Sequence, residues 1–360
     1  MDIKHGTRFF LGANSPEGFC SLFGDFVSVG DGDFLWVIKG GPGCGKSGFM
    51  KKIGKAAEER GYSVEYIACS LEPESMDGVY IPELHVGYVD GSAPHVVETY
   101  NVGAASSYLD LGAYYDIEGL RGKLPELLEL EGRYAQEIER MRTLLSAAGA
   151  VNPRNLPELC SAESCNLAVR RVSGVVSREF GKGGRGKEGA RAKRRFISTF
   201  TADGELFLEE TVNSLCKKVY TLDNDFGLAP AYLDKVEAEA LARGYSPIAC
   251  PNPMEPKQLE SVLIPELSLG FISISSRRRY SGAVYRHVRL DVLLPAELVR
   301  ELRPRYRAAA RMYNEILNLA GESMVQARSI HDEMEALYNP HVEFGAIDAL
   351  AEKHLKMLLG

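Results

Sequence analysis

The chain has 360 residues, a length that favours two domains over one hydrophobic core. Hydrophobic residues make up 45% of it and charged residues 25%, which is the composition of an ordinary globular protein. The net charge of −7 gives no general attraction to nucleic acid or to an anionic membrane, so neither is expected as a partner.

Three features predict a cytoplasmic protein. The first eight residues contain no apolar segment of the kind found in signal peptides. The longest apolar stretch, residues 262–274, is interrupted by Pro265 and Glu266 and is too short to span a bilayer. The chain has seven cysteines, an odd number, and they lack the regular spacing of a disulfide framework. This fits a reducing compartment.

A glycine-rich loop at residues 40–47, Gly-Gly-Pro-Gly-Cys-Gly-Lys-Ser, matches the P-loop pattern. Residues 34–39 before it are typical of a buried strand, and residues 49–60 after it predict a helix. Strand, loop and helix would direct backbone N–H groups and the positive helix end at a polyphosphate. Lys46 would reach the β- and γ-phosphates, and Ser47 would be a ligand of Mg²⁺. The expected nucleotide-binding residues are Gly40, Gly41, Pro42, Gly43, Cys44, Gly45, Lys46 and Ser47.

Residues 86–90 form an apolar strand that ends in Asp90, the Walker B pattern, in which the acid holds Mg²⁺ through water. Many hydrolysing P-loop ATPases carry a glutamate directly after this acid, but here Gly91 follows. His95 is the nearest titratable side chain beyond the strand. It is a candidate for positioning water, sensing the γ-phosphate or contacting a substrate, and a surface-loop or capping histidine is the alternative. The candidate catalytic residues are therefore Lys46, Asp90 and His95.

The second half of the chain repeats the first at an offset of 183 residues. From Arg60 to Gly87, 12 of 28 positions are identical, too many for chance. The features kept in both copies are expected to be architectural. They are a turn into a central strand, Ile-Pro-Glu-Leu, and a helix that ends at Gly61 or Gly244.

The second copy has lost the phosphate-binding residues. At the same offset, residues 40–47 align with residues 223–230 without one identity. The replacements at the key positions are Lys46 by Ala229, Ser47 by Pro230 and Asp90 by Ser273. Because proline has no N–H group and the glycines are gone, a phosphate cradle cannot form there as in the first copy. The sequence predicts one competent site and one degenerate repeat.

Apolar residues at three- and four-residue steps predict long helices in each half, after Pro125 and after Pro304, each followed by a second helix. We expect an α/β fold of two tandem P-loop NTPase-like repeats, each with a helical hairpin extension. The predicted domains are 1–180, with a helical arm from about 117, and 195–360, with C-terminal helices from about 297. Residues 181–194, rich in glycine and basic residues, are predicted to be a linker, with contact to an anionic partner as the alternative.

Three consecutive arginines, Arg277, Arg278 and Arg279, follow the second copy's equivalent of the Walker B strand. A repeat that has lost its own site could present one of them to its partner's γ-phosphate as an arginine finger. A solvent-exposed charged loop is the alternative.

Several segments resemble an uncharacterised family of bacterial tandem P-loop ATPases of about this length. They are Arg8-Phe-Phe, Ser21-Leu-Phe23, the loop at 40–47, the segments 76–84 and 89–97, and Ile330-His-Asp-Glu333. The resemblance implies ATP and Mg²⁺ as ligands. That family usually carries a second P-loop, and residues 223–230 depart from it.

Three functions fit these features. The first is a Mg²⁺-dependent ATPase whose hydrolysis drives a movement between the repeats. The second is a small-molecule kinase with an acceptor pocket beside residues 91–97. The third is a nucleotide-binding switch or scaffold with negligible turnover.

Overall fold

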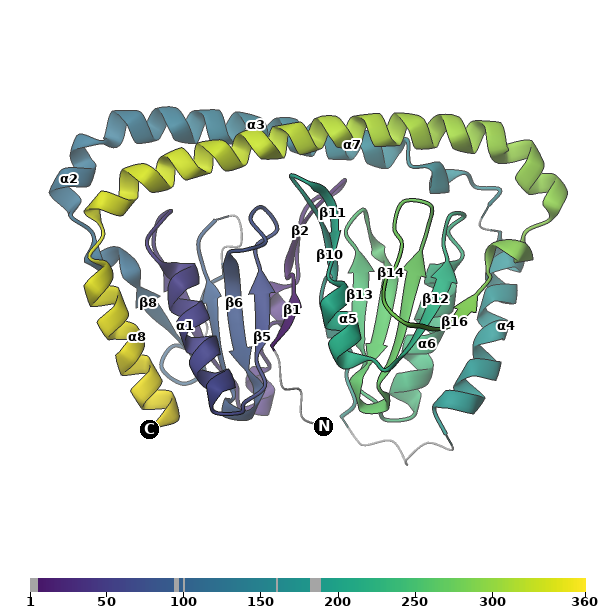
Figure 1. Ribbon diagram of the computed structural model, residues 1–360, viewed down its shortest axis with the longest axis horizontal. Helices are drawn as coiled ribbons and strands as arrows, with labels where there is room; N and C mark the ends of the chain where they lie inside the picture. Colours follow the sequence, from purple (N-terminus) through teal and green to yellow (C-terminus); the bar gives the residue numbers. More distant parts are fainter. Residues whose placement is uncertain (1–5, 94–96, 100, 160, 182–188) are drawn as a thin grey trace.

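The two halves of the chain build the same sheet twice. The computed structural model describes residues 6–93, 97–99, 101–159, 161–181 and 189–360, and its two six-stranded sheets lie beside each other (Figure 1). The first sheet contains, in order, β1 (Thr7–Phe9), β5 (Glu65–Ala68), β6 (Met76–Ile81), β7 (Val86–Asp90), β4 (Phe34–Lys39) and β8 (Ser106–Asp110). The second contains, in the corresponding order, β9 (Lys193–Arg194), β13 (Ile248–Asn252), β14 (Glu255–Ile264), β15 (Leu269–Ile274), β12 (Lys218–Asp223) and β16 (Val284–Val288).

Strand directions also agree between the sheets. In both, the third strand is antiparallel to its two neighbours, and the other neighbouring strands are parallel to each other. Each repeat adds a hairpin beside its sheet: β2 (Gly12–Ser15) with β3 (Gly18–Ser21), and β10 (Ser198–Thr201) with β11 (Gly204–Phe207). The repeat seen in the sequence is therefore a repeat of mixed α/β architecture.

The segments shared by both copies have the structural roles predicted for them. Pro82–Leu84 and Pro265–Leu267 are single 3-10 turns that lead into β7 and β15. The next residue in each turn is left-handed, with a φ of 50° at His85 and 51° at Ser268. Glycines with positive φ follow the two equivalent helices at Lys46–Glu59 and Ala229–Ala242, as expected: Gly61 at 86° and Gly244 at 80°.

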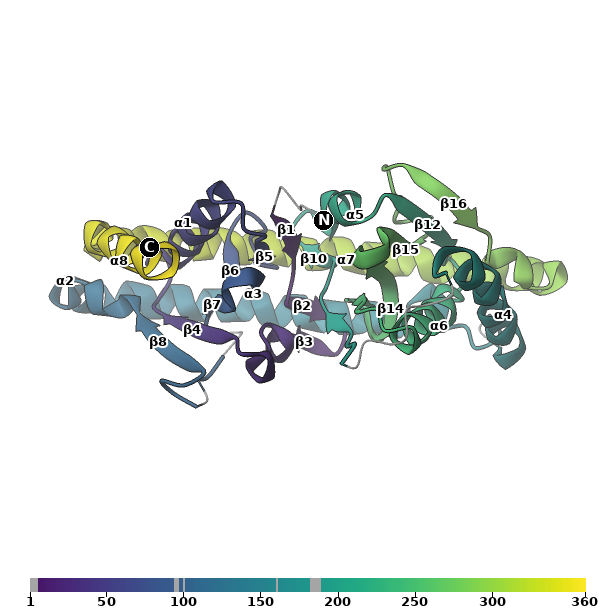
Figure 2. The same cartoon turned by 90° about the horizontal axis from the view of Figure 1, so that it is seen from below.

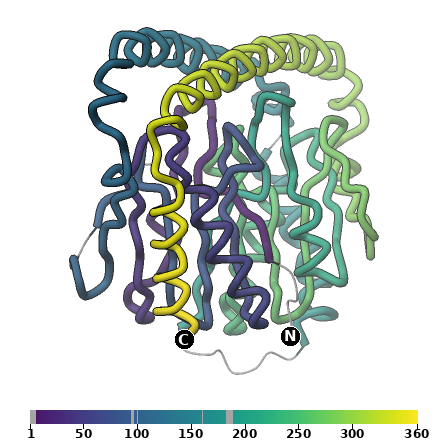
Figure 3. Tube along the Cα trace, turned by 60° about the vertical axis from the view of Figure 1, so that its left-hand side comes forward, coloured from purple at the N-terminus to yellow at the C-terminus, as the bar shows by residue number. Residues whose placement is uncertain are grey.

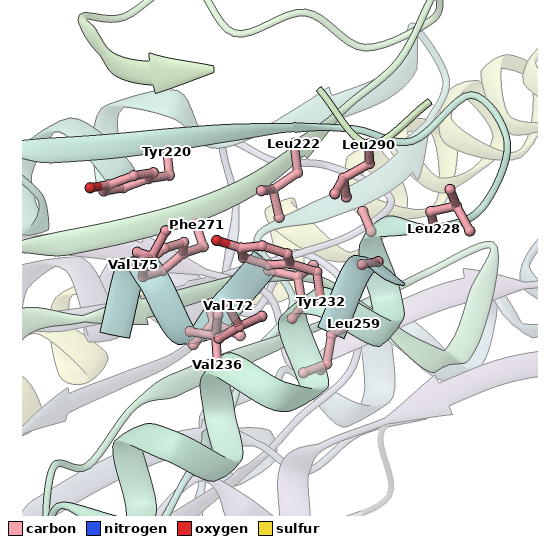
Figure 4. Packing of buried hydrophobic residues seen from close by; sticks show 14 of the residues in the cluster. Val172, Val175, Tyr220, Leu222, Leu228, Tyr232, Val236, Leu259, Phe271 and Leu290 are labelled. Carbon is pink, nitrogen blue, oxygen red and sulfur yellow. The ribbon is translucent and has the colours of Figure 1, made fainter. Parts of the chain in front are cut away.

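Each sheet is covered by two helices, one of which comes from the other half of the chain. The first sheet carries α1 (Lys46–Glu59) and α8 (Phe344–Leu359), and the second carries α6 (Ala229–Ala242) and α4 (Ala162–Glu179). Figure 3 shows α8 in yellow, descending along the first repeat. Figure 4 shows Val172 and Val175 of α4 beside Tyr232 and Phe271 of the second repeat.

This exchange corrects the predicted domain boundaries. The sequence groups α4 with residues 1–180 and α8 with residues 195–360, yet each packs on the opposite sheet. Strand β9, which falls within the predicted linker at 181–194, pairs with β13 at the sheet edge. Apolar periodicity marks which face of a helix is buried, but it does not say which sheet buries it.

Two long helices, α3 (Leu124–Ala150) and α7 (Ala296–Tyr338), run side by side across both sheets (Figures 1 and 2). The short helix α2 (Ile117–Gly122) precedes α3. Met141 of α3 shares a buried cluster with Tyr313 and Met324 of α7. The predicted hairpin within each half is therefore wrong, because the apolar stripe of α3 is buried by the helix from the other half. The apolar periodicity predicts that α7 begins after Pro304. In the structure α7 begins earlier, at Ala296, and Pro304 lies inside it.

The two repeats share a core. Phe9, Ile67 and Val89 of the first repeat belong to one buried cluster with Leu215 and Ile248 of the second. Leu215 ends the short helix α5 (Glu209–Leu215), which lies between the sheets in Figure 1. None of the helices in the described part of the chain has a span long and apolar enough to cross a membrane.

Candidate functional site

The glycine loop joins the end of β4 to the start of α1, as predicted. Gly45 precedes α1 with a φ of 84°, and Gly43 has a φ of 66°. A β-carbon on Gly43 would lie 2.6 Å from the side-chain oxygen of Asn339, so both backbone and space require glycine there. The amides of Lys46 and Ser47 lie in the first turn of α1, where backbone N–H groups lack helical partners and can bind an anion.

Lys46 is folded back onto the loop and toward Asp90. Its ammonium group donates to the carbonyl oxygens of Gly40, at 3.0 Å, and Gly41, at 2.8 Å. The same nitrogen lies 3.5 Å from Oδ2 of Asp90, and both side chains are largely buried, 13% and 14% exposed. The structure therefore brings together the lysine and the acid that the sequence analysis assigned to one site.

The oxygen atoms near this pair fit a cation. Oδ1 of Asp90 accepts from the backbone N of Ser92 at 2.8 Å, whereas the Ser47 hydroxyl accepts from Met76 N at 3.0 Å and keeps a second lone pair. Mg²⁺ takes oxygen ligands and is commonly bound by one or two carboxylates plus substrate phosphates. Among the described residues, no three His, Cys, Asp or Glu side chains form a metal-binding group. Phosphate oxygens would therefore have to complete the coordination.

These groups line a cavity of about 780 Å³ that the second repeat helps to enclose. Arg142 of α3 and Arg328, His331 and Glu335 of α7 also line it. Phe344, the first residue of α8, lies against the glycine loop in the same cavity. One cavity wall therefore comes from helices that run over both sheets.

An acidic side chain of α7 accepts a hydrogen bond from a backbone amide of the glycine loop. Gly43 N donates to Oε1 of Glu335 at 3.1 Å, and Gly41 N donates to the hydroxyl of Tyr115 at 2.8 Å. A phosphate oxygen that accepted from Gly43 N would take the place of the carboxylate, because two anions repel each other at this range. Binding of an anion to the loop therefore requires Glu335 to move.

The remaining predicted site residues have three outcomes. Pro42 lines the cavity with the loop glycines. Cys44 also borders it, but its side chain is buried beside Gly40, which is a packing position. His95 lies outside the described residues, so its role stays a prediction.

At the equivalent place of the second repeat, the described residues enclose a much smaller cavity. Six residues, 40–45, separate β4 from α1, whereas five, 224–228, separate β12 from α6. The ungapped alignment of residues 40–47 with 223–230 is therefore wrong by one residue in the loop. The side chain of Asn224 accepts from Ala229 N at 3.2 Å, and the cavity there measures about 50 Å³.

The three arginines do not reach the first repeat's site. Nη1 of Arg278 lies 2.6 Å from Oε2 of the buried Glu260, and the Arg277 guanidinium lies 4.5 Å from the ring centroid of Tyr313. Both arginines border the small second cavity. Among the described residues that line the cavity at Lys46, none comes from 277–279. The arginine-finger hypothesis is therefore not supported, because Glu260 binds the most buried of the three.

Sequence reasoning missed the contributions of Asp77, Arg142, Arg328 and Glu335 to this cavity. The three helical residues could not be found from the motif, since they depend on the pairing of α3 with α7. Asp77 did leave a signal, because an acid, Glu260, stands at the equivalent position of the second repeat. In comparisons with known proteins, no family model, curated protein or solved structure matches this chain.

Proposed function

We propose that the protein binds one molecule of ATP with Mg²⁺ in the cavity of the first repeat and hydrolyses it. The observation that carries the proposal is the glycine loop between strand and helix, with Lys46 and Asp90 beside it, in a cavity of about 780 Å³. The resemblance to tandem P-loop ATPases points the same way. The second repeat, with a shorter loop and a cavity of about 50 Å³, is proposed to bind no nucleotide.

In this proposal the loop amides and the first turn of α1 bind the phosphates. Lys46 moves from the carbonyl groups of Gly40 and Gly41 to the β- and γ-phosphates, where its charge offsets the charge that develops during transfer. Ser47 and Asp90 would hold Mg²⁺, which supplies further positive charge at the phosphate oxygens. A water oxygen bonds to the γ-phosphorus while the bond to the bridging oxygen breaks, and ADP, phosphate and a proton leave.

The contact between Glu335 and the loop supports a coupled movement. Because α7 spans both repeats, a displacement of Glu335 by phosphate acts on the helix that covers both sheets. The ATPase is therefore proposed to convert nucleotide binding and release into a shift of α7. A switch with negligible turnover would use the same contact.

One observation favours a kinase as the second candidate. Arg142 and Arg328 line the cavity from the helix pair, beside Glu335 and with Arg328 3.7 Å from Glu72, and their guanidinium groups could bind an anionic acceptor. Such an acceptor would replace water as the nucleophile. The phosphoryl group would then remain on the acceptor.

Product analysis with purified protein, ATP and Mg²⁺ tests the proposal. We expect free phosphate and ADP in equal amounts, without any added acceptor. Phosphate found only on a member of an added metabolite pool would replace the ATPase with the kinase. ATP that binds but stays intact over many hours would replace the ATPase with the nucleotide-binding switch.

A further inference from the structure

The outer end of the second repeat is basic, although the chain as a whole is acidic. Figures 1 and 2 show three elements at this end of the molecule: α4, the edge strand β16 and the first turns of α7. The segments that contain them, residues 162–179 and 284–311, hold ten arginines, no lysine and five acidic residues. These two segments, the arginine-rich end, therefore carry a charge of +5, whereas the whole chain carries −7.

The first repeat has the equivalent elements without this charge. Its edge strand β8 and the chain that follows into α3 are residues 106–133, and its covering helix α8 is residues 344–359. These two segments hold five basic and eight acidic residues, which gives a charge of −3. Because the same architecture is built with either sign of charge, folding alone does not explain the ten arginines of the second repeat.

Four of these arginines form one stripe along α7. Arg300, Arg303, Arg307 and Arg311 follow each other at steps of three, four and four residues, which places them on one face of the helix. All four are exposed, and none of their guanidinium groups makes a hydrogen bond or an ion pair within the described part of the chain. At a rise of about 1.5 Å per residue, the stripe is about 16 Å long.

The apolar face of this part of α7 is already buried. Leu302 and Tyr306 pack with Val172 of α4 in the core of the second repeat, so they cannot also insert into a membrane. The side chain of Arg171 on α4 donates to the carbonyl oxygen of Arg289, just after β16, at 2.7 Å. The three elements therefore adjoin, and the exposed arginines of α7 suit a charged polymer better than a lipid bilayer.

From this separation of charge we infer that the arginine-rich end binds nucleic acid through its phosphate backbone. The guanidinium group of arginine is planar and can donate two parallel hydrogen bonds to phosphate oxygens. One strand of a nucleic acid carries a phosphate about every 3.4 Å along the helix axis, so a stripe of this length faces several phosphates at once. The inference does not depend on the proposed function, because it concerns the repeat that is proposed to bind no nucleotide.

Fluorescence anisotropy with a labelled DNA duplex and a labelled single-stranded RNA tests the inference. We expect the full-length protein to bind at low salt, with the logarithm of the binding constant falling linearly as the logarithm of the salt concentration rises. The double variant Arg303→Gln with Arg307→Gln should bind about tenfold more weakly or worse, and its salt slope should fall by about one unit for each arginine removed. Because both side chains are exposed, its thermal unfolding midpoint should match the wild type.

The matched control is Arg133→Gln with Arg140→Gln, which removes two exposed arginines of α3 over the first repeat. It should leave the salt slope unchanged, because these arginines lie outside the arginine-rich end. Failure of the wild-type protein to bind either probe at low salt, or equal binding by the two double variants, would overturn the inference. Binding only to vesicles of anionic phospholipid would assign this end to a membrane, and salt-sensitive self-association without probe binding would assign it to a second copy of the chain. Either result would also overturn the inference.

Discussion

Replacing Lys46 by alanine is expected to lower ATP turnover by about 10²–10³-fold, the loss typical when a preorganised donor to the transition state is removed. The lysine lies at the glycine loop, 13% exposed and 3.5 Å from Asp90, with two backbone carbonyls and the Cys44 sulfur as its other partners. The variant should also bind ATP more weakly, because the side chain contributes a full charge to the phosphates. Phosphate release and calorimetric titration measure the two effects separately.

Lys52→Ala is the matched control for this result. Lys52 lies on the same helix, but its ammonium group pairs with Glu352 of α8, 2.9 Å away, outside the cavity. Its removal should leave turnover within about twofold, because surface ion pairs contribute little. Equal activity in the wild-type protein and Lys46→Ala would show that Lys46 of the glycine loop takes no part in ATP turnover.

The second large effect is expected on stability. Arg195 is 1% exposed and joins the repeats, with Nε bonded to Glu65, Nη1 to Asp25 O at 2.7 Å and Nη2 to Phe26 O at 3.1 Å. Arg195→Ala leaves the Glu65 carboxylate buried without its counter-ion, a change that typically costs about 3–5 kcal/mol. Urea unfolding should show this as a lower free energy of unfolding.

An exposed ion pair between the repeats provides the control for Arg195. Lys257 lies 3.0 Å from Glu17, with side chains 83% and 53% exposed. Lys257→Ala should change the unfolding midpoint little, since solvent screens such pairs. Combining Arg195→Met with Glu65→Leu should recover part of the lost stability, because no unpaired charge then remains buried. An Arg195→Ala protein as stable as the wild type would show that the pair does not hold the repeats together.

Local signals in the sequence predicted the parts of the fold that depend on neighbouring residues. The loop at 40–47, the helix after it and the turn at Pro82–Leu84 all follow from glycine, proline and short-range periodicity. The exchange of α4 and α8 between the sheets could not be predicted, because an apolar stripe fits any complementary surface. The pairing of α3 with α7 was missed for the same reason, although each helix was expected.

The candidate site likewise contains residues that the sequence predicts and residues that only the fold brings together. Lys46, Ser47 and Asp90 could be found from motif spacing, and the structure places all three along one cavity. Glu335 could not, because it is 292 residues from the Gly43 amide that donates to it. The missing residue in the second loop was hidden because the offset of 183, which holds from the following helix onward, was extended back across the loop to a strand that has a different offset. Strand pairing reveals it, since Phe34 pairs with Val86 while Lys218 pairs with Leu269.

Calorimetric titration of the wild-type chain with a non-hydrolysable ATP analogue and Mg²⁺ tests the central claim, one nucleotide site in two repeats, most directly. We expect a stoichiometry of one per chain, lost or strongly weakened in Lys46→Ala and kept in a variant changed at Ala229, the equivalent position of the second repeat. A stoichiometry of two, or one site that survives Lys46→Ala but depends on position 229, would contradict it.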